Sequence, residues 1–150
     1  MDFVEQFQIL IQLLLAVVLG GLIGLEREFK GKQAGLQTYS LVALGACVFT
    51  VISFKLFGVF SNGSNVTFDP SRVIQAIAIG IGFIGAGVIF RQPSGIIGLT
   101  TAAGLWATAA VGVCCGAGFY YLAVLAAFFS LLILAGLGGI EKNVFHKKEE

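Results

Sequence analysis

Four glycines lie inside one long apolar run in the middle of the chain. The run, residues 74–91, reads I-Q-A-I-A-I-G-I-G-F-I-G-A-G-V-I-F-R, with glycines at positions 80, 82, 85 and 87. As G-x-G-x-x-G it matches the dinucleotide-binding fingerprint, which requires a strand, a tight turn and the start of a helix. As an apolar stretch of about eighteen residues it is a membrane helix whose glycines let other helices approach closely. These interpretations are incompatible and place the chain in different classes of protein.

The composition favours the membrane helix. Of the 150 residues, 57% are hydrophobic and 11% are charged, whereas soluble domains carry roughly 25% charged residues. A soluble domain of this size could not hide so many apolar residues. The net charge of +1 provides no overall field that would recruit nucleic acid. Positions 98–118 contain no acidic residue that could hold a ribose, so a nucleotide cofactor is not expected.

Polar loops divide the chain into five apolar segments. They cover residues 7–25, 38–60 and 73–90, a fourth segment near 99–116 and a fifth near 119–139. The uncharged stretch from 96 to 140 is too long for one crossing, since about 20 residues cross a bilayer. Its small residues at 114–118, followed by two tyrosines, predict a hairpin there. We therefore predict an all-α, polytopic protein with five transmembrane helices, a transmembrane domain over 1–140 and a short charged cytoplasmic tail over 141–150.

Charge bias predicts the orientation of these segments. Most of the nine Lys and Arg residues lie on one side of the arrangement, namely Arg27, Lys30, Lys32, Arg91, Lys142, Lys147 and Lys148. Lys55 and Arg72 lie on the other side. The positive-inside rule then puts the N-terminus outside and the tail in the cytoplasm. The acidic start lacks a basic n-region, so the first apolar segment is expected to be retained and not cleaved as a signal peptide.

Small residues give the third segment two smooth faces. They are Ala76, Gly80 and Gly87 on one face and Ala78, Gly82 and Ala86 on the other, with Gly85 between them. A helix of this kind can contact neighbours on more than one side. We expect it to be the central packing element, or to dock a partner through Gly80, Gly82, Gly85, Ala86 and Gly87. Its expected neighbours in the first and fourth segments are Gly20, Gly21, Gly24, Gly104 and Gly112.

Charged residues near the segment ends have two interpretations each. Glu26, Arg27 and Glu28 are either local ion pairs in a solvated loop or a site that recognises a partner or an ion. Asp69 in the sequence D-P-S-R is a good N-cap, to which Arg72 can pair back. If Asp69 also binds a cation, it offers one carboxylate, so Mg²⁺ would keep most of its waters. Asp69 is thus a weak metal candidate.

Uncharged polar residues suggest structural tasks. Thr100 and Thr101 are expected to cap the fourth helix in preference to bonding across helices. The amides of Gln8, Gln12 and Gln75 are expected to join helices, with Gln75 buried.

No enzyme site emerges from the sequence. Cysteines 47, 114 and 115 lie in apolar runs, where cysteine acts as a small hydrophobe, and their spacing does not predict a metal site. No ionisable group lies at mid-bilayer depth, and the one histidine, His146, is in the tail.

Five blocks of sequence together resemble the MgtC/SapB membrane-protein family. They are G-G-L-I-G-L-E-R-E at 20–28, A-G-L-Q-T-Y-S-L-V-A-L-G-A at 34–46, D-P-S-R at 69–72, G-I-G-F-I-G-A-G-V-I at 80–89 and G-L-T-T-A-A-G-L-W at 98–106. Their order and spacing match the family over about residues 15–115. The polar motif positions carried onto this chain are Glu26, Arg27, Glu28, Asp69, Arg72, Arg91, Thr100, Thr101 and Trp106.

The resemblance implies a bacterial inner-membrane protein of a short form, without the soluble C-terminal domain of the virulence-type relatives. It also implies a link to growth under magnesium limitation, to survival inside macrophages and to inhibition of the proton-translocating ATP synthase. Three motif positions depart from the family pattern. Gln37 and Tyr39 stand where the family often has Arg and His, and Ile97 replaces a basic residue.

Two functions compete on these grounds. The first is a non-enzymatic regulator linked to magnesium homeostasis, acting by helix–helix contacts with a second copy or another membrane protein. The alternative is a small oligomeric transporter or channel for Mg²⁺ or another ion, with Asp69 at its outer mouth. A purely structural assembly subunit is not separated from the first by sequence. No cofactor is expected, with Mg²⁺ left open.

Overall fold

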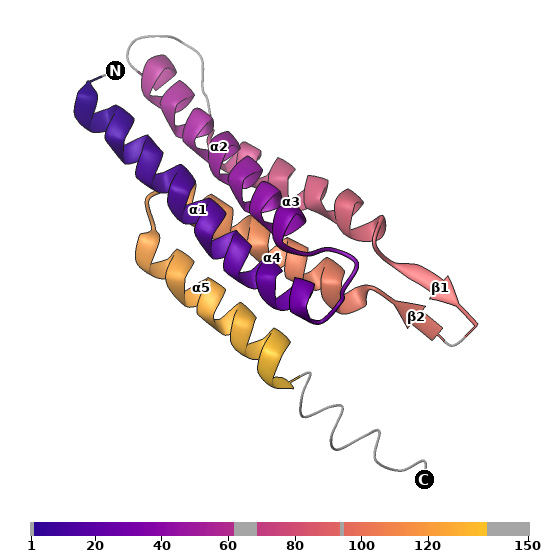
Figure 1. Cartoon of the computed structure of the whole chain (residues 1–150). Coiled ribbons are helices and arrows are strands. Elements are labelled where there is room, and N and C mark those ends of the chain that lie inside the picture. Colours follow the sequence, from indigo (N-terminus) through magenta and orange to yellow (C-terminus); the bar gives the residue numbers. More distant parts are fainter. Residues whose placement is uncertain (1, 62–68, 94, 138–150) are drawn as a thin grey trace.

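A computed structural model describes residues 2–61, 69–93 and 95–137 of the chain. The helices are α1 (Phe3–Phe29), α2 (Leu36–Ser61), α3 (Ser71–Ala86), α4 (Leu99–Gly116) and α5 (Tyr120–Leu132), which a π-helical turn, η1 (Ile133–Leu137), continues. An antiparallel hairpin of β1 (Phe90–Gln92) and β2 (Gly95–Ile97) joins α3 to α4. Consecutive helices run in alternating directions along a common axis (Figure 1).

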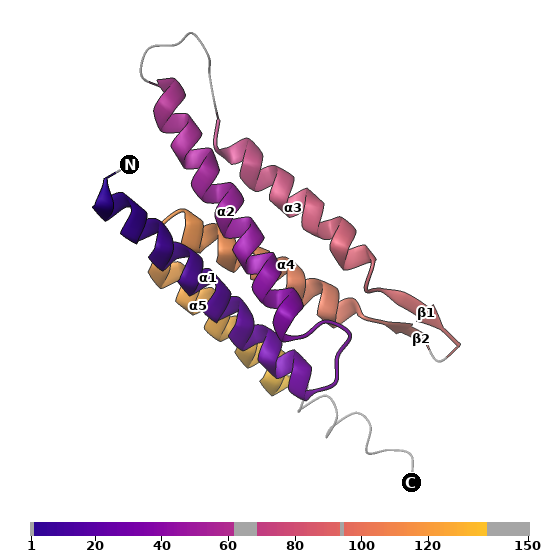
Figure 2. The same ribbon diagram turned by 45° about the horizontal axis from the view of Figure 1, so that its top comes forward.

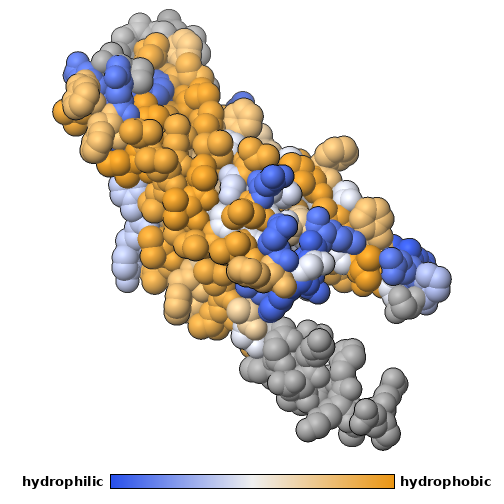
Figure 3. All heavy atoms as spheres, in the orientation of Figure 1, coloured by the Kyte–Doolittle hydropathy of each residue, from blue (hydrophilic) through white to orange (hydrophobic). Residues whose placement is uncertain are grey.

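Four of these helices are long and apolar enough to cross a membrane. They are α1, α2, α4 and α5 with its π-helical turn. On the face drawn in Figure 3, hydrophobic residues cover most of the length of the helices and hydrophilic ones gather towards the two ends. The prediction of an all-α membrane protein is confirmed, with the short hairpin as an addition. Helix α3 has 16 residues, which rise about 24 Å and so fall short of a hydrocarbon core of about 30 Å.

Several element boundaries differ from the predicted ones, and two of these differences bear on the candidate site. The third segment was expected to run to Phe90, but α3 ends at Ala86 and Phe90 pairs with Ile97 in the hairpin. The predicted loop starting at Glu26 is instead helical as far as Phe29. Glu and Arg are strong helix formers, and an ion pair of 2.7 Å between Glu26 and Lys30 supports this last turn.

The central helix of the bundle is α4, which packs against α1, α2, α3 and α5 (Figure 2). Helix α3 lies at the edge, beside α4 and α2, and its buried residues are Ile81 and Gly85. The expectation that the glycine-rich helix forms the centre is therefore wrong for a single chain.

Glycines of α1 and α4 allow both helices to pack closely against α2. A Cβ atom placed on Gly20 would lie 2.6 Å from the Cβ of Ala43, and one on Gly104 would lie 2.5 Å from the Tyr39 hydroxyl. Gly112 sits equally tightly against the backbone carbonyl of Ala43. Any side chain at these positions would push the helices apart. The glycines that the sequence suggested as neighbours of α3 therefore pack against α2.

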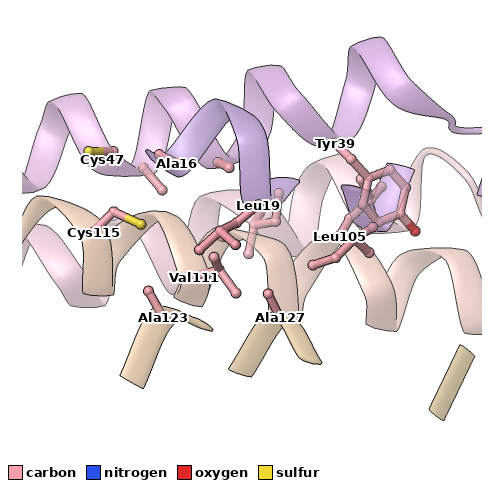
Figure 4. Packing of buried hydrophobic residues seen from close by; sticks show 14 of the residues in the cluster. Ala16, Leu19, Tyr39, Cys47, Leu105, Val111, Cys115, Ala123 and Ala127 are labelled. Carbon is pink, nitrogen blue, oxygen red and sulfur yellow. The ribbon is translucent and has the colours of Figure 1, made fainter. Parts of the chain in front are cut away.

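The apolar core fills the space between α1, α2, α4 and α5 (Figure 4). Its buried members include Ala16, Leu19, Tyr39, Cys47, Leu105, Val111, Cys115, Ala123 and Ala127. Cys47 and Cys115 are free and buried, in agreement with their expected use as small hydrophobes. Gly118, with φ of +80°, makes the predicted turn between α4 and α5.

Candidate functional site

The last turn of α1 carries a largely buried cluster of charges. The Glu26 carboxylate accepts hydrogen bonds from Arg27 Nε at 2.6 Å and Arg27 Nη2 at 3.0 Å, and pairs with Lys30 Nζ at 2.7 Å. Arg27 is only 2% exposed. Two cations thus surround one carboxylate, so Glu26 is neutralised within the chain.

The same two cations bind the end of the last helix. Arg27 Nη2 donates to the backbone carbonyl of Leu134 at 3.3 Å, and Lys30 Nζ donates to the same oxygen at 2.8 Å. Leu134 lies in the π-helical turn that ends α5. Carbonyls at a helix C-terminus carry partial negative charge, which nearby cations stabilise. The charged turn of α1 therefore clamps the end of α5.

Glu28 points away from this clamp. Its Oε2 accepts the backbone N–H of Leu36 at 3.0 Å, at the first residue of α2. A carboxylate here satisfies an otherwise unpaired N–H and interacts favourably with the positive end of the helix. The structure thus brings Glu26 and Arg27 together and gives Glu28 a separate structural task.

Tyr39, one of the departures from the family pattern, is a fully buried core residue. Its hydroxyl donates to the carbonyl of Thr101 at 3.2 Å and joins α2 to α4. Of the other two departures, Gln37 is exposed and Ile97 lies half-buried in β2. The signal in the sequence is a bulky side chain at position 39 for which a glycine at position 104 leaves room.

The two threonines do not cap α4. The N-cap is Gly98, with φ of +90° and no side-chain capping hydrogen bond. The carbonyl of Val88 sits where a side chain at position 98 would project, so the cap position accepts only glycine. Thr101 is buried and supplies the carbonyl that Tyr39 binds, while Thr100 is exposed. Trp106, farther along α4, is 57% exposed.

The opposite end of the bundle holds Asp69 and Arg72. Asp69 Oδ1 accepts the backbone N–H of Ser71 at 2.9 Å. Hydrogen bonds from the side chain and backbone of Ser71 hold the pKa of Asp69 below its usual range. The N-cap position of α3 is Pro70 and not Asp69. Arg72 is exposed and makes no ion pair with any described residue, so the predicted pair with Asp69 is absent.

The described residues do not assemble a metal centre. No three His, Cys, Asp or Glu side chains come together among them in a way that could hold an ion. Asp69 is a single exposed carboxylate, and Glu26 is already paired with two cations. A hydrated Mg²⁺ at Asp69 would keep most of its waters.

The three amides have different surroundings. Gln12 is buried and donates to the carbonyl of Gly116 at 3.1 Å, which confirms that it joins α1 to α4. Gln8 is exposed and lines a small polar cavity of about 190 Å³ beside the ion pair of Lys55 with Glu5. Gln75 is exposed, contrary to the prediction, because α3 lies at the edge of the bundle.

The two smooth faces of α3 meet different surroundings. Ala76 and Gly80 line an apolar groove of about 720 Å³ between α2 and α3. The other face, Ala78, Gly82 and Ala86, is exposed outside this groove. Gly85 packs against α4, since a Cβ atom placed on it would lie 3.5 Å from the Cβ of Ala102. Gly87 is the C-cap of α3.

Four long apolar helices, of which α1, α2 and α4 pack closely through glycines, define a multi-pass α-helical membrane protein. The chain belongs to the MgtC family, whose model matches residues 13–143, and the predicted resemblance is thereby confirmed.

Three relatives illustrate the similarity. The chain is 41% identical to "Putative magnesium transporter YhiD" of Escherichia coli (strain K12), over 93% of this chain and 61% of that protein. It is 48% identical to Protein MgtC of Brucella abortus (strain 2308), over 80% and 47%. It is 39% identical to Protein SapB of Bacillus subtilis (strain 168), over 91% and 59%. The chain thus spans about half to three fifths of the length of these relatives. No solved structure matches it.

Proposed function

We propose that this protein is a non-enzymatic regulator in the bacterial inner membrane, which acts by docking α3 against a helix of a membrane partner. The observation that carries the proposal is the open face of α3, formed by Gln75, Ala78, Ile79, Gly82 and Ala86, all exposed. A Cβ on Gly82 would meet no atom within 4 Å. In lipid, small residues let a second helix approach closely, and an amide such as Gln75 can hydrogen-bond across the interface.

In the proposed topology α3 also crosses the membrane, which brings the number of crossings to five, and the N-terminus lies outside. It is supported by the direction of α3, which runs opposite to both α2 and α4 (Figure 2). It is also supported by the charges near the ends of the helices, with Arg27, Lys30, Lys32 and Arg91 towards one end and Lys55 and Arg72 towards the other. A short hydrophobic helix is accommodated by local thinning of the bilayer. The tail at 141–150, with Lys142, Lys147 and Lys148, lies outside the described residues.

The proposed process is adaptation to low magnesium. Support comes from the name of YhiD and from membership of the MgtC family. The resemblance noted from the sequence makes the ATP synthase the first partner to test, and a second copy of the chain the next.

Crosslinking inside the membrane tests the regulator. A photoreactive residue at Gly82 or Ala86 is expected to capture one defined partner. Gly82→Leu should abolish capture from position 86, because its side chain fills the open face. Gly80→Leu is the matched control, since position 80 is equally free of neighbours within 4 Å but lines the groove. Capture of nothing at either position, not even a second copy, would remove the basis of the proposal.

A second candidate is an oligomeric transporter for Mg²⁺ or another ion, favoured by the name of the relative YhiD. It predicts Mg²⁺ flux into liposomes from purified protein. Flux should be lost with Asp69→Ala and kept with Ser71→Ala, which leaves the carboxylate in place. Flux and partner capture measured on one preparation decide between the candidates, and absence of flux would count against transport.

A further inference from the structure

The groove between α2 and α3 has the character of a hydrocarbon site. Its volume is about 720 Å³, and Thr38 is the one polar residue among those that line it. Its lining includes the buried residues Ala46, Ile81 and Ala109 and the exposed rings of Phe49 and Phe83. A lining without charge favours an occupant that is itself apolar.

The length of the groove matches one leaflet of a bilayer. On α2 the lining runs from Thr38 to Phe49, and on α3 from Val73 to Ile84. Each stretch rises about 16 Å, which is close to half of a hydrocarbon core of about 30 Å. An acyl chain that extends through one leaflet spans the same length.

A cation stands at one mouth of the groove. Arg72 directly precedes the lining residue Val73, is exposed, and makes no ion pair with a described residue. A guanidinium binds phosphate through two parallel hydrogen bonds. Of the other charges near this end, Lys55 pairs with Glu5, and Asp69 accepts the N–H of Ser71 and interacts electrostatically with Arg72 without forming an ion pair with it.

The start of α3 is tied to α2 at this same mouth. The hydroxyl of the buried Ser53 donates to the carbonyl of Pro70 at 3.3 Å. This bond holds the first turn of α3, and with it Arg72, close to the groove.

We propose that the groove binds a phospholipid, with one acyl chain between α2 and α3 and the phosphate at Arg72. The inference rests on the proposed crossing of the membrane by α3, and is independent of the choice between regulator and transporter. The lipid covers the face of Ala76 and Gly80 and leaves the open face of α3 available to a protein partner.

Photolabelling of the full chain in detergent tests this site. The probe is phosphatidylglycerol with a diazirine on one acyl chain, and labelled residues are mapped by mass spectrometry. Labels are expected on groove residues such as Phe49 and Ile77. Gly80→Leu fills the groove and should reduce them at least about tenfold, whereas Gly82→Leu, on the other face, should not. Arg72→Gln should reduce labelling at least about tenfold at limiting lipid, because the charge-assisted hydrogen bonds to the phosphate are lost.

Diacylglycerol carrying the same diazirine is the matched probe, since it lacks the phosphate. It should label the groove more weakly and should not respond to Arg72→Gln. Unreactive Cys47 and Cys115 in Gly80→Leu would show that the variant is folded, because both thiols are buried.

Three results would overturn the lipid site. They are labelling of exposed α5 residues such as Phe128 as strongly as the groove, unchanged labelling in Gly80→Leu, or crosslinks from the groove to a second copy instead of lipid. The accessibility of a cysteine introduced at position 82 reports separately on whether α3 lies in lipid. A failure of the lipid site and a failure of the proposed crossing are therefore distinguishable.

Discussion

Arg27 and Leu134 are 107 positions apart in the sequence, yet the guanidinium of one donates to the backbone carbonyl of the other at 3.3 Å. Lys30 reaches the same oxygen, and both cations pair with the carboxylate of Glu26. The charged turn of α1 therefore binds the end of α5 through a backbone carbonyl, a group that every residue possesses. The clamp lies in the last turn of α1, at one end of the apolar helix.

Replacing Arg27 by methionine is expected to destabilise the protein. The change removes the bond to Leu134 and leaves Glu26 with Lys30 alone, so the free energy of unfolding should fall by about 3 kcal/mol. Thermal unfolding in detergent, followed by a thiol-reactive dye that reports the buried Cys47 and Cys115, measures the shift. Lys32→Met is the control, because Lys32 is exposed. Equal shifts in both variants would contradict the clamp.

The contact between Gly104 and Tyr39 predicts a non-additive pair of substitutions. Gly104→Ala should cost about 1–3 kcal/mol, since the new Cβ would meet the Tyr39 hydroxyl at 2.5 Å. Tyr39→Phe should cost about 1 kcal/mol through the lost bond to Thr101. The double variant should cost less than the sum, because removing the hydroxyl makes room for the methyl group. Unfolding midpoints of the four proteins give the coupling, and strict additivity would argue against this packing.

Gln12 and Gln8 lie one turn apart in α1 and should respond differently to substitution. Gln12→Leu removes the hydrogen bond to Gly116 and should lower stability by about 1 kcal/mol. Gln8→Leu, at an exposed position, should change the unfolding midpoint little. If the two variants melt alike, the amide of Gln12 does not join α1 to α4.

The proposed topology predicts opposite accessibility for the two ends of the bundle. In a background with Cys47, Cys114 and Cys115 replaced by alanine, Lys32→Cys should react with membrane-impermeant reagents from the cytoplasmic side. Arg72→Cys should react from the outer side, because the positive-inside rule assigns the more basic end to the cytoplasm. Gln92→Cys, near the tip of the hairpin that follows α3, should react from the cytoplasmic side. Reaction of positions 72 and 92 from the same side would exclude the proposed crossing of α3.

Much of the secondary structure was predictable from local patterns. The uncharged stretch after Ile96 divides into α4 and α5 at the small residues 114–118, since Gly118 adopts the left-handed conformation there. The end of α3 was not predictable in the same way. Residues 87–90 are as apolar as the helix before them, yet 87 and 88 form a turn and Phe90 pairs with Ile97 in the hairpin.

The candidate site was predictable in its members but not in its contacts. Charges near the ends of apolar segments singled out Glu26 and Arg27. Their shared partner is a backbone carbonyl, which has no signature in the sequence. The same limit applies to the smooth faces of α3, because a row of small residues permits close approach without specifying the helix that approaches.

The sequence by itself determined that this chain forms apolar helices and where most of them end. In lipid every backbone polar group must be satisfied within the segment, so long uncharged runs have few alternatives to the helix. Only the tertiary structure decided which glycines are used. Those of α1 and α4 pack against Tyr39 and Ala43 of α2, while Gly80 and Gly82 of α3 meet no neighbour within 4 Å. The physical reason is that close packing depends on the shape of both surfaces, and the sequence of one helix describes only its own.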